Sequence, residues 1–415
     1  MRIEVPYGGS TQTAELANAD RVRILSTCAP VGAEHHSTLR QALKHPVGAP
    51  PLHEFAGRSQ QLVVIVNDAT RATPTAQALE FVHHDLANVD DLSLVVATGT
   101  HRAPTDHELR NILGGLSDFW MPRAHVHDAR DASGLVSVGT TSRGNEVLLN
   151  RLVVEAESLL VIGSVEPHYF AGYTGGRKSF LPGVAAYETV ERNHALAMEP
   201  ASRPAALDGN PVHDEMMEAV ALMAGHPVWS VATVSDAEHR IVHAAAGGLN
   251  ESFGEAVRAA RSVFEVPVDC PFDVVVAVAP PPMDRDLYQA HKALEHGNLA
   301  LREGGIIILV SECAEGIGQT SFAEILEAAA TPTDAARVAR AEYRLGNHKV
   351  ARIASMACRA EIWAVTGIDG NRLKSIFMRP FGDLQSALEA ALDRLGPDAR
   401  VLVMPDASIT VPVLR

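Results

Sequence analysis

Short apolar runs recur along the chain and are separated by polar segments of helical length. Runs that are rich in branched residues and end in glycine or polar residues are typical of buried strands. The predicted strands are residues 62–66, 92–98, 159–164, 229–234, 273–279, 305–310, 362–365 and 400–404. Between them, apolar residues at three-to-four spacing predict helices, for example at residues 74–83, 211–223 and 384–395.

Strands that alternate with helices predict an α/β fold, in which mainly parallel sheets are flanked by helices on both faces. At 415 residues the chain is too long for one ordinary core, so two domains are expected. Two prolines precede a new apolar strand near residue 270, and we place the boundary there. The N-terminal α/β domain is expected to span residues 1–268, and a smaller C-terminal α/β domain residues 269–415.

Polar side chains follow three of the predicted strands. The strand at 62–66 leads to Asp68 and Arg71, the next strand leads to His101, and the strand at 159–164 leads to His168. Parallel strands end at one edge of a sheet, and ligands of open α/β proteins bind just beyond that edge. The sequence therefore predicts one active site to which all three strand ends contribute.

The stretch from residue 166 to residue 194 concentrates the most chemistry. Its Gly175-Gly176-Arg177-Lys178 turn could hold a phosphate, because glycines let backbone N–H groups approach an anion. The spacing is not that of a Walker A loop, and alone such a turn is more often a surface turn. Its position close to His168 favours the phosphate interpretation.

Two histidines at neighbouring strand ends suit acid/base chemistry, because imidazole titrates near neutral pH. Taken singly, His101 or His168 would more often be structural or exposed. Arg71 has the planar fork that binds a carboxylate, although a surface arginine would look the same. Asp68 has three interpretations: it orients a histidine, binds a hydroxyl, or caps the helix that starts near Pro74.

Two further features gain meaning only in combination with others. His194 lies in a predicted helix without a second ligand at HxxxH spacing, so a metal there would need ligands from elsewhere, a cofactor included. Tyr288, Gln289 and Lys292 are three to four residues apart and can share one helical face. An ordinary solvated helix face would show the same spacing.

The net charge of −15 argues against nucleic acid or an anionic membrane as a partner. An anionic substrate would therefore need a local cluster of cationic side chains. The N-terminus lacks a signal pattern, and no apolar run reaches the roughly 18 residues of a spanning helix. The four cysteines are far apart and form no CxxC pair, which favours reduced thiols and a cytoplasmic location.

Together these motifs resemble the nickel-dependent lactate racemase family, the LarA-like 2-hydroxyacid racemases and epimerases. The resemblance extends over most of the chain. Asn67 and Ala72 depart from the usual aspartate and proline of the family, but both departures spare the residues to which a function is assigned. The matching motifs are D-x-T-R-x-x-P from Asp68 to Pro74, G-T-H-R with His101, P-H-x-x-A-G-Y-T-G-G-x-K ending at Lys178, the spacing to His194, Tyr288-Gln289-x-x-Lys292, and Gly346-Asn-His-Lys349.

The resemblance implies a cofactor that the residues alone do not indicate. This is a nickel-pincer nucleotide, pyridinium-3-thioamide-5-thiocarboxylic acid mononucleotide, attached covalently to Lys178, with His194 as the protein ligand of its nickel. His101 and His168 match the acid/base pair of the family. The implied cofactor contacts are Asp68, Thr174, Gly175, Gly176 and Tyr288, and the implied substrate contacts are Arg71, Gln289 and Lys292.

The expected activity is inversion of the α-carbon of a 2-hydroxycarboxylic acid by reversible hydride transfer to this cofactor. One histidine takes the hydroxyl proton, and the other serves the opposite face. Because Lys292 and His101 fall in different predicted domains, the active site is expected in a cleft between them. Lactate, malate, aromatic hydroxyacids and sugar acids all fit, the expected protein partners are enzymes of cofactor synthesis and insertion, and the oligomeric state is not predicted.

Two alternatives remain open from the sequence. The first is an α/β enzyme that binds a nucleotide or a sugar phosphate and carries no adduct on Lys178. The second is a protein that binds or stores the cofactor without catalysis, which would have no need of both His101 and His168.

Overall fold

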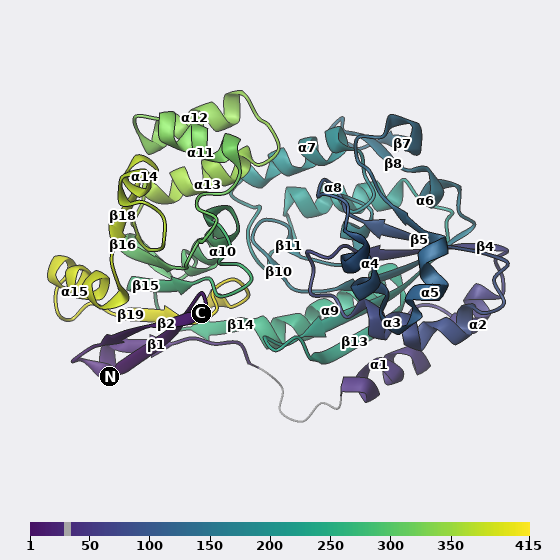
Figure 1. The fold of residues 1–415 in the computed structure, drawn as a ribbon, viewed down its shortest axis with the longest axis horizontal. Helices are drawn as coiled ribbons and strands as arrows, with labels where there is room; N and C mark the ends of the chain where they lie inside the picture. The colour runs from purple at the N-terminus through teal and green to yellow at the C-terminus, as the bar shows by residue number, and fades with distance from the viewer. Residues whose placement is uncertain (29–34) are drawn as a thin grey trace. The chain divides into compact units, whose positions relative to one another are not determined.

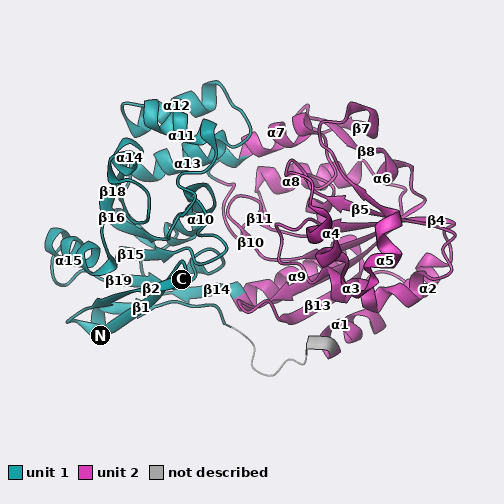
Figure 2. Cartoon of the chain, viewed as in Figure 1, with its two compact units in different colours: residues 1–28, 197–200, 264–415 teal, residues 29–196, 201–263 magenta. Residues whose placement is uncertain are grey.

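The computed structural model describes residues 1–28 and 35–415, and the chain divides into two compact units (Figure 2). Unit 1 comprises residues 1–28, 197–200 and 264–415, and unit 2 comprises the remaining residues, 29–196 and 201–263. Each unit has a mainly parallel sheet flanked by helices (Figure 1), so the predicted α/β class is confirmed.

Unit 2 is built on a six-stranded sheet in which β13 is antiparallel to β12 and the other neighbours are parallel. In sheet order its strands are β13 (Ile241–Gly248), β12 (Val228–Ser235), β9 (Ser158–Ser164), β4 (Gln61–Asn67), β5 (Asp91–Ala97) and β6 (Ala124–Val126). Its helices are α1 (His35–Lys44), α2 (Leu52–Ala56), α3 (Thr75–Val82), α4 (Asp106–Leu113), α5 (Ser117–Trp120), α6 (Arg151–Glu155), α7 (Tyr187–Ala195), α8 (Pro211–Ala221) and α9 (Leu249–Phe264). Small hairpins pair β7 (Leu135–Thr140) with β8 (Glu146–Asn150) and β10 (Pro167–His168) with β11 (Gly172–Tyr173).

The central strands of unit 2 are buried on both faces, which explains their continuous apolar sequences. Every residue of β9 is buried, and so are the five inner residues of β4. A strand covered by helices on both sides needs apolar residues at successive positions instead of alternate ones. The strands predicted at 62–66 and 159–164 are thereby confirmed.

The strand order of unit 2 reverses beside β4. From β4 the chain builds outward through β5 to β6, then returns to the other side of β4 as β9 and builds outward through β12 to β13. This reversal is a topological switch point, where the connections after two adjacent strands diverge and leave a crevice for a ligand. The loops after β4 and β9 both begin there.

Unit 1 has a fully parallel six-stranded sheet. Its strands, in sheet order, are β18 (Met378–Phe381), β17 (Glu361–Val365), β16 (Leu301–Val310), β15 (Phe272–Val278), β19 (Val401–Met404) and β3 (Val22–Ile24). Its helices are α10 (Leu287–Gly297), α11 (Thr320–Ala328), α12 (Pro332–Ala341), α13 (Asn347–Ala357), α14 (Gly370–Ser375) and α15 (Leu384–Leu395). Two smaller sheets pair β1 (Arg2–Tyr7) with β2 (Ser10–Glu15) and β14 (Glu265–Val268) with β20 (Val411–Leu414).

The division into units differs from the expected one in its N-terminal part. We expected residues 1–268 to form one domain, but residues 1–28 pack in unit 1, and the units change between Val263 and Phe264. The reason is that β3 extends the unit 1 sheet beside β19, and the apolar side chains of the β1–β2 hairpin join a unit 1 core with Leu384 of α15.

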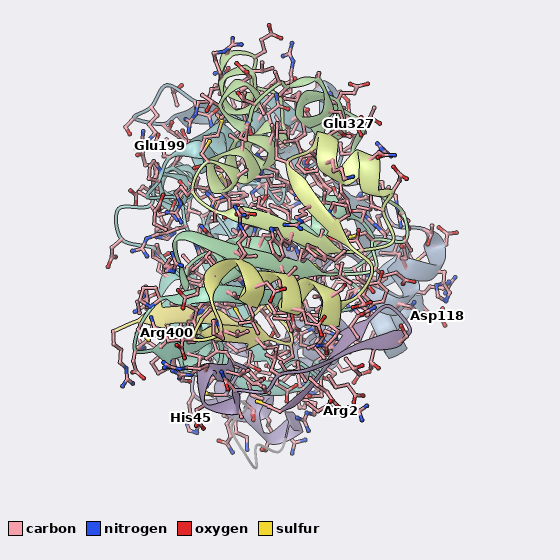
Figure 3. All side chains as sticks on the ribbon, turned by 90° about the vertical axis from the view of Figure 1, so that its left-hand side faces the viewer. Arg2, His45, Asp118, Glu199, Glu327 and Arg400 are labelled. Atoms are coloured by element: carbon pink, nitrogen blue, oxygen red, sulfur yellow. The ribbon has the colours of Figure 1, made fainter. Side chains whose placement is uncertain are left out.

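Charged side chains lie on the surface of the protein. Side chains such as Arg2, Asp118 and Glu327 point outward from the ribbon (Figure 3). Within the part of the chain that the structure describes, no helix is both long and apolar enough to cross a membrane.

Candidate active site

The first part of the site lies where β4 and β5 end. Asp68 follows β4, His101 follows β5, and the register of these neighbouring parallel strands places Asn67 opposite Ala97. The Asp68 Oδ2 atom lies 2.8 Å from Nδ1 of His101. The predicted convergence of these two strand ends is therefore confirmed at the level of a side-chain contact.

The carboxylate of Asp68 is fixed on both of its oxygens. Thr70 donates to Oδ1 through its hydroxyl at 2.7 Å and through its backbone N–H at 3.2 Å, while Oδ2 faces His101. Burial alone would raise the pKa of Asp68, but the bonds from His101 and Thr70 and the nearby charge of Arg71 hold the pKa below its usual value. Asp68 is thus an ionised carboxylate, and it is 5% exposed.

One of the three interpretations of Asp68 is wrong, and another is supported by a contact. Helix α3 is preceded by Pro74 and has no side-chain cap, so Asp68 does not cap it. The contact with His101 supports the interpretation that Asp68 orients a histidine. Its predicted contact with the cofactor stays a prediction.

His168 lies beyond β9, on the adjacent side of the switch point. It belongs to the short β10–β11 hairpin, in which it pairs with Gly172. The backbone N–H of Ala171 donates to Nδ1 of His168 at 3.2 Å, and the ring stacks on Tyr169 with centroids 5.0 Å apart. His101 and His168 thus follow strands that flank β4 on its two sides.

Phe170 joins three of the predicted residues into one cluster. Its ring meets the His168 ring edge-on at 4.5 Å between centroids and the His194 ring at 5.0 Å. The Nζ atom of Lys178 lies 5.6 Å from the centroid of the same ring. Residues that are up to 26 positions apart therefore surround one aromatic side chain.

His194 is suited to bind a metal as a neutral ligand. Burial lowers its pKa to about 3, and the charges of Lys178, His101 and Arg71 contribute in the same direction. The side chain still keeps partial exposure on α7, so a ligand can reach it. Neutral imidazole is the form that coordinates metal ions.

An anionic substrate of this acidic protein would need a local cluster of cationic side chains, and such a cluster lies around His194. Lys178, His101 and Arg71 all act on its pKa, so these potential cations gather around one point of unit 2. The guanidinium of Arg71 has no ion-pair partner among the described residues, which leaves its fork available for a carboxylate.

The glycine turn has a structural explanation within the protein. A Cβ atom on Gly175 would lie 2.8 Å from the Ser164 carbonyl oxygen, and one on Gly176 would lie 2.8 Å from the Phe253 ring. Both glycines have positive φ angles, 80° and 54°. The turn therefore needs glycine in order to pack closely, whether or not a phosphate binds beside it.

The side chains of Arg177 and Thr174 hold this turn in place through hydrogen bonds to backbone groups. Arg177 is 1% exposed, donates to the Ala171 carbonyl at 2.7 Å and to the Gly175 carbonyl at 3.2 Å, and burial lowers its pKa to about 9. The Thr174 hydroxyl donates to the Ser164 carbonyl at 2.9 Å and accepts from the Glu166 N–H. The buried turn holds Lys178, which is only 9% exposed, next to the end of β9.

In unit 1, the predicted helical face is confirmed on α10. Tyr288, Gln289 and Lys292 are each partly exposed, and Nζ of Lys292 donates to Oε1 of Gln289 at 2.9 Å. Asp286 caps the helix by accepting from the Gln289 N–H at 2.8 Å. The helix follows β15, at the point where the strand order of unit 1 reverses between β15 and β19.

Lys349 contacts this helical face through the backbone and the ring of Tyr288. Its Nζ atom donates to the Tyr288 carbonyl at 2.7 Å and lies 3.2 Å from the centroid of the Tyr288 ring. Burial, reinforced by the charge of Lys292, lowers the pKa of Lys349 well below its ordinary value. The Gly346-Asn-His-Lys349 motif therefore holds Tyr288 in place on α10.

The lowered pKa values of two buried histidines of α10 lead to a prediction of how the stability of unit 1 depends on pH. Burial lowers the pKa of His296 to about 4 and the pKa of His291 well below its ordinary value. The unfolded chain takes up these protons near pH 6.5, so the free energy of unfolding should fall as the pH drops from about 6.5 towards 4, by about 3 kcal/mol for His296 alone.

Urea unfolding of unit 1 at pH 7, 6 and 5 measures this dependence. The His296→Gln variant should show a shallower decrease than the unmodified protein over the same range. Equal slopes for the two proteins would contradict the assignment to His296.

The structure thus gathers His101, Asp68, Arg71, His168, Lys178 and His194 in unit 2, and Tyr288, Gln289 and Lys292 in unit 1. Sequence reasoning gave no role to Phe170, and it named Arg177 and Lys349 only as members of motifs. Phe170 occupies an unspecified position of its motif, and a phenylalanine gives no chemical signal. A buried Arg177 or Lys349 could not be told from a solvated cation by its spacing alone.

The chain matches two family models. The lactate racemase N-terminal domain matches residues 7–205, and the lactate racemase C-terminal domain matches residues 268–413. The lactate racemase of Thermoanaerobacterium thermosaccharolyticum is 29% identical over 97% of both chains, and that of Lactiplantibacillus plantarum is 28% identical over 97% of this chain and 98% of the other.

Solved structures give the same result for the fold. The structure of the lactate racemase apoprotein from Thermoanaerobacterium thermosaccharolyticum covers all of both chains with a TM-score of 0.92 at 28% identity. A protein from Thermotoga maritima, at 16% identity, shares the fold with a TM-score of 0.70 and covers 94% of this chain and all of the other.

These matches extend over both units and include every candidate residue. They define the protein as an enzyme of the isomerase class, a racemase. It belongs to the lactate racemase family.

Proposed function

We propose that this enzyme inverts the α-carbon of a 2-hydroxycarboxylic acid by reversible hydride transfer, with a nickel-pincer nucleotide attached to Lys178. The observation that supports this most is the packing of His168, Lys178 and His194 around Phe170. It brings the proposed acid/base group, the proposed covalent attachment point and the proposed metal ligand to one place. The Asp68–His101 pair at the next strand end completes the set.

The donor set fits such a cofactor. Lys178 would hold it covalently, and His194, which burial keeps neutral, would supply the protein ligand of nickel. Among the described residues, no group of three or more His, Cys, Asp or Glu is arranged to hold a metal ion, so in this proposal the cofactor brings the other ligands. When bound, it supplies the hydride acceptor and the metal that tunes it.

The residues of the chain perform the remaining tasks. Arg71 binds the substrate carboxylate through its guanidinium, whose charge already reaches Asp68 and His194. His101 and His168 hold or accept the hydroxyl proton on the two faces of the substrate. Gln289 and Lys292 are further candidate carboxylate ligands, and Tyr288 is a candidate cofactor contact.

Lactate is the first substrate to test, because both curated relatives are named lactate racemase. Malate, aromatic hydroxyacids and sugar acids share the carboxylate and the α-hydroxyl and belong in the same screen. The enzymes that synthesise and insert the cofactor are the proposed protein partners. The proposed location is the cytoplasm, and the four cysteines, all free thiols here, agree with a reducing compartment.

The intact mass of protein produced together with the cofactor-synthesis enzymes tests the proposal. We expect a nucleotide-sized adduct that contains nickel and disappears in the Lys178→Ala variant. Lys374→Ala, which removes an exposed lysine of α14, is the matched control and should keep the adduct. The loaded protein should then racemize an added 2-hydroxyacid.

The absence of an adduct, with synthesis enzymes that load a known acceptor, would contradict the proposal. It would favour an enzyme that binds a nucleotide or a sugar phosphate without a covalent link. That alternative lacks a specific observation here, because Gly175 and Gly176 already have a packing reason to be glycine.

A further inference from the structure

The two histidines of the site are held by opposite kinds of hydrogen-bond partner. Nδ1 of His101 faces a carboxylate oxygen of Asp68, which can only accept a hydrogen bond when ionised. Nδ1 of His168 faces the backbone N–H of Ala171, which can only donate. A neutral imidazole carries its proton on one nitrogen, so each partner selects a different tautomer.

We propose that Asp68 is a positioning residue that fixes the proton of His101 on Nδ1, while the Ala171 N–H fixes the proton of His168 on Nε2. This inference rests on the proposed function and deepens it. In the resting protein, Nε2 of His101 is then a proton acceptor, and Nε2 of His168 is a hydrogen-bond donor. The two histidines are chemically unequal before any substrate binds.

The hydrogen bonds and the burial of Asp68 determine which tautomer of His101 is favoured. Thr70 donates twice to Oδ1, so Oδ2 remains for His101. The carboxylate is 5% exposed, whereas 47% of the His101 side chain is exposed, so the ring is held at its inner edge and accessible elsewhere. Nε2 lies on the ring edge away from Nδ1 and is the atom that can meet a substrate hydroxyl.

The proton balance shows what this inequality means for turnover. When Nε2 of His101 takes a hydroxyl proton, the imidazolium keeps its Nδ1–H on Asp68, and the pair goes from a net charge of −1 to zero. His168 can accept a proton on Nε2 only after its existing proton has moved to Nδ1, and Nδ1 must first lose the bond from Ala171. In the resting enzyme the first proton transfer is therefore from the hydroxyl that faces His101. For protonation of the product hydroxyl on the other face, His168 must first take up a proton from solvent on Nδ1, and His101 later releases its proton to solvent.

Asp68→Asn provides a sharp test because the two amide atoms are not equivalent at this position. The amide oxygen should stay with the two Thr70 donors, which leaves the NH₂ group opposite His101. That group donates, so Nδ1 of His101 must become the acceptor and its proton must move to Nε2. A nearly isosteric substitution thus removes the basic atom from the substrate side.

The measurement is ¹⁵N NMR of histidine-labelled protein at pH 8, made without added cofactor. His101→Gln and His168→Gln identify the two signal sets by their absence. We expect the Nδ1–H form at His101, the Nε2–H form at His168, and a change of His101 to the Nε2–H form in Asp68→Asn. Thr70→Val keeps the carboxylate and should leave His101 in the Nδ1–H form.

Activity gives the second readout. In loaded protein, Asp68→Asn should lower kcat by roughly 10²- to 10⁴-fold, as the loss of a correctly protonated base does. The Nε2–H form at His101 in the unmodified protein, the Nδ1–H form at His168, or an unchanged His101 signal in Asp68→Asn would each overturn the inference. Correct tautomers without any adduct on Lys178 would instead leave the inference intact and refute the proposed function.

Discussion

Loaded protein that carries His101→Ala or His168→Ala should lose racemization by about 10²- to 10⁴-fold relative to the unmodified enzyme. Each histidine is expected to serve one face of the substrate, and inversion needs both faces. His101 has an ionised carboxylate to stabilise its protonated form, and His168 is held by a backbone N–H.

Racemization is followed by the loss of optical rotation of a single enantiomer, with the amount of adduct determined in every sample. His125→Ala, which removes an exposed histidine of β6, is the matched control and should retain activity. Because Lys178 is unchanged, both active-site variants should still carry the adduct. Substantial activity in both variants at equal loading would refute the scheme with two acid/base groups.

Arg352→Ala should destabilise unit 1 by about 3–5 kcal/mol. The guanidinium of Arg352 bonds to the carboxylate of Glu295, and their side chains are only 15% and 5% exposed. Arg352 also donates to the Ala197 carbonyl at 3.1 Å and thereby holds residues 197–200 in the unit. Its removal leaves a buried carboxylate without its cation, which costs more than the lost attraction itself.

A double variant separates the buried charge from the packing. Arg352→Met together with Glu295→Leu removes both charges and keeps apolar volume, so it should recover most of the lost stability. Urea unfolding of the three proteins gives the free energies of unfolding. A double variant as unstable as Arg352→Ala would show that packing, not the unpaired carboxylate, causes the loss.

The central strands could be predicted well from the sequence because their burial leaves a continuous apolar run within each strand. Strands such as β4 and β9 are buried on both faces, and a continuous apolar run follows directly from that burial. The strands that sequence reasoning missed lack this signal. The β1–β2 hairpin is largely polar, β3 has three residues, and β13 is rich in alanine and glycine.

The candidate residues and the meeting of strand ends could be predicted from the sequence, but most of the contacts between the side chains could not. That Asp68 would meet His101 follows from the pairing of β4 with β5, and strand pairing is a property of the whole sheet. The hydrogen bond from Ala171 to His168 depends on the geometry of the short β10–β11 hairpin. Phe170 could not be singled out because its role comes only from the side chains around it.

The position of residues 1–28 has a consequence for synthesis on the ribosome. Strand β3 is synthesised before all of unit 2, but its partner β19 begins only at Val401. At about 5–20 residues per second, β3 waits on the order of tens of seconds for that partner. Unit 2 lies almost entirely between them and can fold first, as an insertion in an unfinished unit 1. The segment of residues 1–28 therefore waits longest for its place in a sheet and gives a chaperone a long opportunity to bind.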